Sequence, residues 1–204
     1  MDSYTHNKKK TQLTLHHMTI TAMLSAISTV LMFLSFSVPF APSFLKLDFS
    51  ELPALLASFT LGSFYGVAVV LIKNLINVFF TTTGGIGELA NFMIGSAFVF
   101  SAGVIYKYKK TKIGALVSML SGTVVMAIIG TLANYLLLMP MYSLIMPMDA
   151  IINLFQSINP YADSLLKIMF ITIVPFNLVK GLLVSVITYL LYKKLSVLIK
   201  RKFY

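Results

Sequence analysis

The 204-residue chain contains no cysteine, and its three histidines, His6, His16 and His17, all precede the first long apolar run. Disulfide bonds, thiolate metal sites and thiol chemistry are therefore excluded. Charged residues make up only 11% of the chain, whereas a soluble domain carries about 25%. Hydrophobic residues make up 58%, and the mean hydropathy is +0.89. This composition predicts a single transmembrane domain, residues 1–204, that lies almost entirely within lipid.

Catalytic and energy-coupling groups are also missing from the apolar runs. No carboxylate lies centrally in such a run, as proton-coupled transport usually requires. The sequence has no Walker motif, no Ser/His/Asp constellation and no pair of catalytic acids. The chain is also too short for a paired inverted-repeat transporter. We therefore expect no enzyme, metal or cofactor, but a protein that binds a ligand and depends on a partner for energy.

Most of the 16 basic residues lie in three clusters, at 8–10, 107–112 and 193–202, whereas nearly all acidic residues lie elsewhere. This separation is the positive-inside pattern of membrane proteins. It predicts a basic cytoplasmic N-terminal segment at 1–15, a cytoplasmic central loop and a basic cytoplasmic tail at 193–204. The net charge of +10 then needs no nucleic-acid partner, because the clusters orient the chain and contact anionic lipid.

The apolar runs predict six transmembrane helices with both termini in the cytoplasm. Four runs each suit one crossing of the ~30 Å hydrocarbon core, at 18–38, 89–106, 113–139 and 164–192. An even number of crossings must connect the N-terminus to the central loop, so Leu52–Phe80 must supply two helices. We expect a turn near Gly62 to Gly66 (GSFYG) to divide it. The first of these helices would be only about 15 Å long and must be tilted, extended or sheltered by protein.

Lys180 lies in the middle of the last apolar run, between the uncharged stretches Ile168–Val179 and Gly181–Tyr192. A cation at this depth in a bilayer costs about 3 kcal/mol on insertion scales. Asn177 projects from the same helical face, just after Pro175, which interrupts the backbone hydrogen-bond ladder. This pattern indicates a polar binding cavity, and the alternative is a lysine that snorkels to the interface.

The predicted outer segment 39–53, PFAPSFLKLDFSELP, is unusually apolar for a solvated connector. Its prolines prevent a helix from continuing, while Phe44 and Leu45 are large apolar residues within it. Such a loop could cap a cavity, with Lys46 and Asp48 supplying polar contacts. The alternative is an interfacial loop whose aromatic rings rest among lipid headgroups.

Amide side chains supply further polar groups in the outer half of the predicted bundle. Because the helices alternate in direction, Asn91 and Asn134 fall near the level of Asn177 and Lys180. Together these groups would recognise a neutral, hydrogen-bonding, partly aromatic molecule, although each amide could instead bond a neighbouring helix. Glu88 near the start of its helix fits a helix-dipole and capping role.

The longest outer segment, 140–163, is interrupted by prolines and is expected to form a short helix lying across the outer surface. Just beyond its end, Asp163 and Lys167 are four residues apart and can pair on one helical face. We expect that pair to have a local role.

Several stretches resemble the substrate-binding S components of energy-coupling factor (ECF) transporters, and among them the riboflavin-specific subunits. The resemblance covers every predicted helix except the first, in the order and spacing of the family. It rests on FLKLDFSELP (44–53), GSFYGVAVVLIKNLINVFF (62–80), GGIGELANF (84–92), ANYLLLMPMY (133–142) and VPFNLVKG (174–181).

The resemblance implies six helices that hold the vitamin near the outer side, beneath the first outer loop. It implies that the capping loop contributes Leu45, Lys46 and Asp48. It further implies that the isoalloxazine ring or ribityl chain is hydrogen-bonded by Asn91, Asn134, Asn177 and Lys180.

The resemblance also implies partners. In this family the S component docks on a transmembrane coupling subunit driven by two cytoplasmic ATPases, through an Ala-x-x-x-Ala pattern on the first helix. Here TAMLSAIS supplies Ala22 and Ala26 on one helical face. Ordinary small-residue helix packing is the alternative interpretation of this pair.

We therefore expect a multi-pass protein of the bacterial cytoplasmic membrane that captures riboflavin for ATP-driven uptake. An S component for another vitamin or precursor is one alternative. A small stand-alone facilitator, which would transport without ATPase subunits, is another. An intramembrane enzyme is disfavoured because the catalytic groups are missing.

Overall fold

The structure is a computed structural model that describes residues 2–39, 41–42 and 44–200, with side chains described for 14–39, 41–42 and 44–191. Most side chains of the predicted cytoplasmic segments 1–15 and 193–204 thus lie outside the described residues. The elements in chain order are α1 (Asp2–Phe33), β1 (Phe36–Ser37), β2 (Lys46–Leu47), α2 (Glu51–Thr60), α3 (Ser63–Val78), α4 (Ile86–Tyr108), α5 (Lys112–Ala133), η1 (Asn134–Leu138), α6 (Met139–Ser143), α7 (Met148–Gln156), α8 (Leu165–Ile168), η2 (Met169–Ile173) and α9 (Val174–Lys200).

Four of the described helical segments are long and apolar enough to cross a bilayer: Thr14–Phe33, Ile86–Tyr108, Lys112–Ser143 and Leu165–Leu191. The 10-residue α2 and the 16-residue α3 lie where the sequence predicts two further crossings. Both are shorter than the roughly 20 residues that a perpendicular helix needs to span the hydrocarbon core. The described backbone is mainly helical, as predicted for an all-α membrane protein.

The predicted division of the 52–80 run is confirmed. Gly62 lies between α2 and α3 with a φ of 122°, a backbone conformation that favours glycine. With a length of about 15 Å, α2 is too short to span a membrane alone. It is sheltered by protein, because α1, α3, α4 and α9 pack around it and most of its side chains are buried.

Close packing of α2, α3 and α4 depends on a glycine. A Cβ added at Gly66 of α3 would lie 2.5 Å from Cγ1 of Val99 and 2.8 Å from the carbonyl oxygen of Ala54. The absence of a side chain therefore lets α3 lie directly against α2 and α4. Around this contact, the central core buries Leu55, Val69, Phe98, Tyr106 and Met119.

Two wide π-helical turns precede prolines in the longest helical segments. The first, η1, ends two residues before Pro140, and the second, η2, ends two residues before Pro175. Proline has no N–H to donate, and its ring clashes with the carbonyl four residues earlier. A π turn relieves this conflict, and such turns are frequent at functional sites. The interruption predicted at Pro175 therefore takes the form of a local widening of the helix.

The short helix predicted within 140–163 is α7. Its Ile151 and Phe155 are buried in an apolar cluster with Met139, Ile168 and Met169. The predicted pair of Asp163 and Lys167 is present, with 2.6 Å between Oδ2 and Nζ, and both side chains are about half exposed. The expected pairing is therefore confirmed, and the pair lies at the surface.

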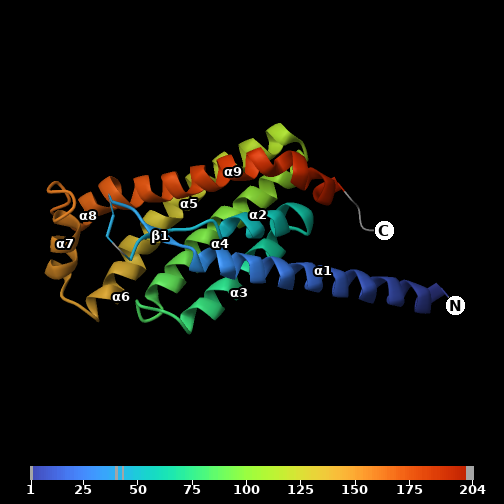
Figure 1. Cartoon of the computed structure of the whole chain (residues 1–204), viewed down its shortest axis with the longest axis horizontal. Coiled ribbons are helices and arrows are strands. Elements are labelled where there is room, and N and C mark those ends of the chain that lie inside the picture. Colours follow the sequence, from blue (N-terminus) through green and yellow to red (C-terminus); the bar gives the residue numbers. More distant parts are fainter. Residues whose placement is uncertain (1, 40, 43, 201–204) are drawn as a thin grey trace.

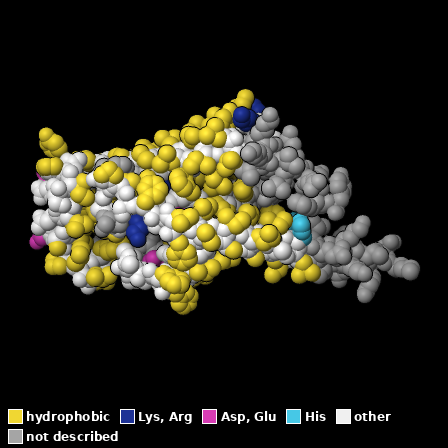
Figure 2. Space-filling view, in the orientation of Figure 1, with side chains coloured by type: hydrophobic (Ala, Val, Ile, Leu, Met, Phe, Trp, Pro, Cys, Tyr) yellow, Lys and Arg dark blue, Asp and Glu magenta, His cyan; other side chains and the backbone are white. Residues whose placement is uncertain are grey.

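The helices form an elongated bundle. The N-terminal end of α1 and the C-terminal end of α9 lie at the same end of the molecule, opposite α7 (Figure 1). Hydrophobic side chains cover most of the described surface between the two ends (Figure 2). Large exposed apolar side chains occur on α1, α3, α4, α5 and α9. Such a surface suits lipid, because the tails are as apolar as the side chains.

Candidate functional site

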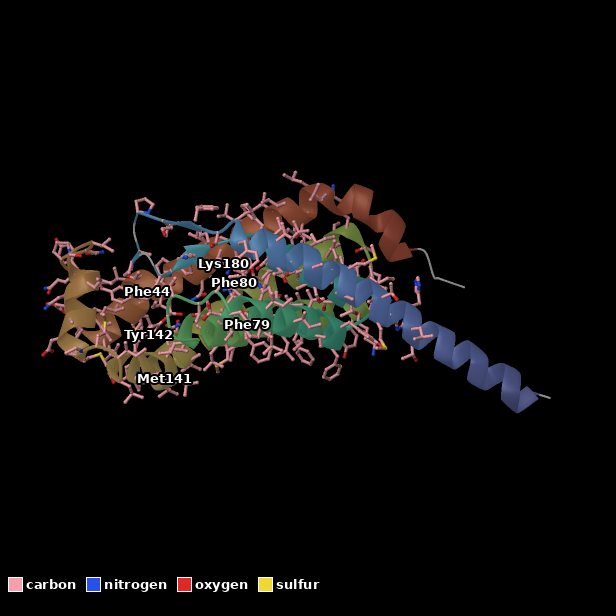
Figure 3. The ribbon with its side chains drawn as sticks, turned by 60° about the horizontal axis from the view of Figure 1, so that its bottom comes forward. Phe44, Phe79, Phe80, Met141, Tyr142 and Lys180 are labelled. Carbon is pink, nitrogen blue, oxygen red and sulfur yellow. The ribbon has the colours of Figure 1, made fainter. Side chains whose placement is uncertain are left out.

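The predicted capping loop is anchored on both sides. It forms a short antiparallel hairpin in which Phe36 pairs with Leu47, and residues 40 and 43 lie outside the described residues. Phe44 lies beside Tyr142 (Figure 3), with 5.5 Å between the ring centroids. Its ring centroid is also 5.8 Å from that of Phe155. Leu47 is buried in a second apolar contact with Phe176 of α9. The loop is thus packed against α6, α7 and α9.

A cavity of about 230 Å³ lies beneath this loop. Its walls come from the loop and from α1 to α6, η1, η2 and α9. All seven ligand-site residues predicted from the sequence line it: Leu45, Lys46, Asp48, Asn91, Asn134, Asn177 and Lys180. The fold therefore brings together residues that are up to 135 positions apart in the sequence, Leu45 and Lys180 being the extremes.

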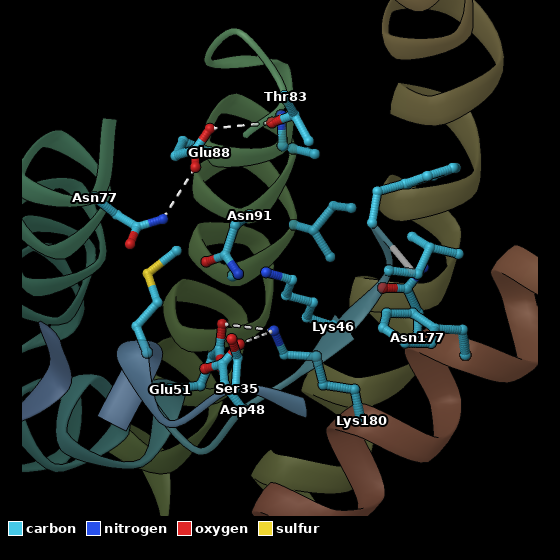
Figure 4. Close-up of a pocket in the computed structure, with 18 of the residues that line it drawn as sticks. Ser35, Lys46, Asp48, Glu51, Asn77, Thr83, Glu88, Asn91, Asn177 and Lys180 are labelled. Carbon is cyan, nitrogen blue, oxygen red and sulfur yellow. Dashed lines mark hydrogen bonds and ion pairs between the residues drawn. The ribbon is translucent and has the colours of Figure 1, made fainter. Parts of the chain in front are cut away.

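Lys180 is buried and paired with two carboxylates. Its Nζ donates to Oδ2 of Asp48 at 2.9 Å and lies 3.4 Å from Oε1 of Glu51 (Figure 4). Only 6% of the lysine side chain is exposed, so it does not snorkel toward an interface. Ion pairing offsets the large cost of removing the ammonium from water. Lys180 thus fixes the capping loop to α9.

Glu51 has a second ammonium partner in Lys73 of α3. The Nζ of Lys73 is 3.0 Å from Oε1 of Glu51, and it also donates to the hydroxyl of Ser50. Ser50 donates its hydroxyl and its backbone N–H to Oδ1 of Asp48, the latter at 2.8 Å. The hydroxyl of Ser28 on α1 donates to the carbonyl of Ser50 at 2.6 Å. Two carboxylates and two ammonium groups therefore form a buried network whose formal charges cancel.

The surrounding charges determine the protonation of Asp48. Burial alone would raise the pKa of this carboxyl. The ammonium groups of Lys180 and Lys73, with the hydrogen bond from Ser50, instead hold the pKa of Asp48 well below its ordinary value. Asp48 is therefore ionised throughout the neutral and mildly acidic range.

We expect the stabilising contribution of Asp48 to be constant over this range. A carboxyl whose pKa is depressed by folding contributes stability that is present above its unfolded pKa and is lost as the pH falls through its folded pKa. The gap in melting temperature between the wild type and Asp48→Asn should therefore be the same at about pH 8 and about pH 5. A gap that narrows markedly at the lower pH would show that Asp48 is not held by these ammonium groups.

Asn134 and Asn177 both line the cavity. Each Nδ2 donates to the carbonyl four residues earlier in its own helix, at 2.7 and 2.9 Å respectively. Within the described part of the chain, neither side-chain oxygen receives a hydrogen bond, so both remain available as acceptors. Asn91 differs, because its Oδ1 accepts from Nδ2 of Asn74 on α3 at 3.3 Å, a helix-to-helix bond.

Lys46 adds a donor at the mouth of the cavity. It is exposed on β2 and extends toward Asn91 (Figure 4). Among the described residues it has no ion-pair partner. Its ammonium is therefore available to an acceptor on a bound ligand.

Glu88 forms a second acidic centre in the cavity wall. It lies in the first turn of α4, where the helix dipole stabilises a negative charge, as predicted. Its carboxylate accepts from Asn77 at 3.0 Å, from Thr81 at 2.7 Å and from Thr83 at 3.3 Å. From the sequence we expected Glu88 only to act at the helix end, and its position in the cavity wall was not predicted.

Other polar residues of the lining were not predicted from the sequence, among them Ser35, Glu51, Thr83 and Tyr142. Most of them are individually unremarkable in the sequence. Glu51 is the exception, because a signal for it existed. An ionisable residue inside a membrane domain usually has a partner of opposite charge, and Lys73 lies in the next apolar helix.

Ala22 and Ala26 lie away from the cavity, on an exposed face of α1. The opposite face of this helix buries its polar side chains Thr21, Ser25, Ser28 and Thr29 against the bundle. The alanine pair is therefore not used to pack α1 against the described helices of its own chain. It is open to lipid or to another membrane protein.

Comparison with known proteins gives consistent matches. The family model described as "ECF transporter, substrate-specific component" matches residues 16–192. The riboflavin transporter RibU of Staphylococcus aureus (strain TCH60) is 38% identical over 88% of this chain and 90% of its own length. The riboflavin transporter FmnP of Bacillus subtilis (strain 168) is 34% identical over 87% of this chain and 90% of its own.

A solved structure agrees in fold as well as in sequence. It is described as "Structure and mechanism of the S component of a bacterial ECF transporter" and matches with a TM-score of 0.73 and 36% identity. The match covers 92% of this chain and 99% of that chain. Residues 16–192 also include the capping loop and all the residues that line the cavity. The chain therefore belongs to the substrate-specific components of ECF transporters and is a multi-pass protein of the cell membrane.

Proposed function

We propose that this chain binds riboflavin in the cavity beneath the 39–53 loop. One observation carries the proposal: the cavity combines amide acceptors, a lysine donor and apolar walls, in a chain that is similar to riboflavin transporters over most of its length. Riboflavin has a flat, partly apolar ring with N–H and carbonyl groups at one edge and a chain of hydroxyls. Such a molecule suits a cavity of mostly apolar lining with a few placed polar groups.

The polar groups suggest how the ligand is held. In our proposal the amide oxygens of Asn134 and Asn177 accept hydrogen bonds from the ring N–H or the ribityl hydroxyls. Lys46 donates to a ring carbonyl or a hydroxyl, and Asn91 contributes its remaining donor. Lys180 acts mainly through Asp48, by holding the loop that carries Leu45 and Lys46 over the ligand.

We further propose that the energy for uptake comes from partner proteins. The chain would dock on a transmembrane coupling subunit, which two cytoplasmic ATPases drive, through the face of α1 that carries Ala22 and Ala26. The exposure of that face supports this assignment, and small residues allow close approach of helices in a membrane.

In the membrane, α2 and α3 would complete a six-helix topology with both termini cytoplasmic. Two observations support this arrangement. The N-terminal end of α1 and the C-terminal end of α9 lie at the same end of the molecule (Figure 1). This arrangement requires an even number of membrane crossings. The basic cluster at 107–112 assigns the cytoplasm to the ends of α4 and α5 that it joins.

Purification tests the proposed ligand directly. The protein isolated in detergent should carry the flavin absorption band or, once stripped of ligand, should quench the fluorescence of added riboflavin with a stoichiometry of one per chain. Thiamine, pantothenate and biotin serve as competitors, and they should not displace the flavin. Folded protein that shows no saturable binding of micromolar riboflavin would overturn the proposal, as would preferential binding of another vitamin.

A further inference from the structure

Lys73 is a buried charge that ligand contact does not explain. Its side chain is fully buried, with 0% exposure, in the middle of the apolar helix α3. It does not line the cavity, although its partner Glu51 does. A lysine in such a position is costly, so its presence calls for a role that operates through its neighbours.

The contacts of Lys73 lead to the capping loop by two routes. The first route passes through Glu51, whose Oε1 lies 3.0 Å from Nζ of Lys73 and 3.4 Å from Nζ of Lys180. Through Ser50, Lys73 reaches Oδ1 of Asp48, since the Ser50 hydroxyl bonds both groups. Both routes end on the Asp48–Lys180 pair that fixes the loop to α9.

We infer that Lys73 is a positioning residue for ligand binding: it neutralises Glu51, keeps Lys180 on Asp48, and so keeps the capping loop in place over the cavity. This inference rests on the proposed binding of riboflavin. Lys73 itself touches no ligand in this scheme.

The charge balance explains why removal of Lys73 should matter. Without it, Asp48 and Glu51 share the single ammonium of Lys180, and the buried network carries a net charge of −1. Lys180 is then drawn toward Glu51, so the loop loses part of its anchor. Among the side chains that the structure describes, the other elements around α2 supply no replacement, because α1 contributes Ser28 and α4 contributes Gly95, neither of which titrates.

The same balance predicts a pH effect. Two carboxylates that share one cation repel each other, so one of them takes up a proton more readily. Uptake of one proton restores neutrality and relieves the competition of the two carboxylates for Lys180. Glu88 and Lys46 line the same cavity, but within the described residues neither bonds to Glu51 or Lys180. The pH response of the variant should therefore come from Asp48 and Glu51.

Riboflavin titrations of Lys73→Met at two pH values test the inference. At about pH 8, where both carboxylates are charged, the variant should bind riboflavin at least about tenfold more weakly than the wild type. At about pH 5 much of this loss should be recovered, whereas the wild type should change little, because its network is already neutral.

Two further variants separate positioning from general damage. In Lys73→Met/Glu51→Gln the network is neutral at both pH values, so binding should be stronger than in Lys73→Met at the higher pH and independent of pH. Lys167→Met is the matched control, because it removes an exposed lysine from a half-exposed pair, and it should bind like the wild type. If Lys73→Met does not fold, Lys73→Gln replaces it in the same titrations.

The outcomes are distinct. A wild type that fails to bind riboflavin removes the proposed function and leaves the inference without a basis. A wild type that binds, together with a folded Lys73 variant of unchanged affinity, overturns the inference alone. A weakened variant that shows neither pH recovery nor rescue by Glu51→Gln also overturns it, because only a charge imbalance predicts both.

Discussion

Lys180→Met should lower the affinity for riboflavin by about a hundredfold or more. Removing one partner from a buried ion pair costs about 3–5 kcal/mol, because the other charge is left uncompensated. Asp48 would lose its 2.9 Å contact, and the capping loop would keep only its apolar contact with α9, through Leu47 and Phe176. If only about 2.7 kcal/mol of this cost is lost from the binding free energy, the Kd for riboflavin rises a hundredfold. Fluorescence titration with riboflavin measures it.

A charge-balanced double variant shows how the loss arises. Lys180→Met/Asp48→Asn leaves Glu51 paired with Lys73, so the network is again neutral. It should bind more tightly than Lys180→Met but more weakly than the wild type, because the ion pair between the loop and α9 is still missing. Lys167→Met is again the control. Wild-type affinity in folded Lys180→Met would contradict the assignment of this lysine to the binding site.

Gly66→Leu should destabilise the protein severely. The added Cβ alone would lie 2.5 Å from Val99 and 2.8 Å from a backbone oxygen of α2, so the helices themselves must move apart. Overpacking typically costs about 1–3 kcal/mol of folding free energy and occasionally more. We expect a cost at the upper end of this range, because the added side chain would clash with the backbone of α2, which cannot rotate away. We expect a fall in melting temperature of at least about 5 °C, or no folded protein at all, in detergent.

Phe64→Leu is the matched control, since it places leucine on the same helix at a position that is 79% exposed. Its stability should lie within about 0.5 kcal/mol of the wild type. Because α2 carries Glu51, a folded Gly66→Leu protein should also bind riboflavin more weakly. Unchanged stability in Gly66→Leu would show that α3 does not need to approach α2 and α4 this closely.

Much of the site was predictable because the membrane makes polar residues informative. In an apolar segment, the cost of an unpaired polar group means that a lysine or amide usually faces a cavity or a partner. Lys180, Asn177 and Asn134 stand out in the sequence for this reason, and all three line the cavity. The turn at Gly62 was predictable by a different argument. An even number of membrane crossings before the central loop required two helices within the short run 52–80.

The partners of these residues were less predictable: Lys73 in an apolar helix implied an acidic partner, but no local pattern identified which carboxylate it was. Glu51 and Glu88 lie at the starts of helices, where a carboxylate has an ordinary explanation in the helix dipole. Their position in the cavity depends on how the helices pack. The π turns before Pro140 and Pro175 likewise depend on the helical context of each proline.

By itself, the sequence determined that this is an apolar, mainly helical membrane protein with a buried polar site, because hydropathy and charge placement are local properties that lipid selects directly. The tertiary structure alone decided that α2 is sheltered by four helices and that Asp48, Glu51, Lys73 and Lys180 meet in one neutral network. Charge pairing at distances near 3 Å depends on packing between segments far apart in the chain, which no local pattern encodes.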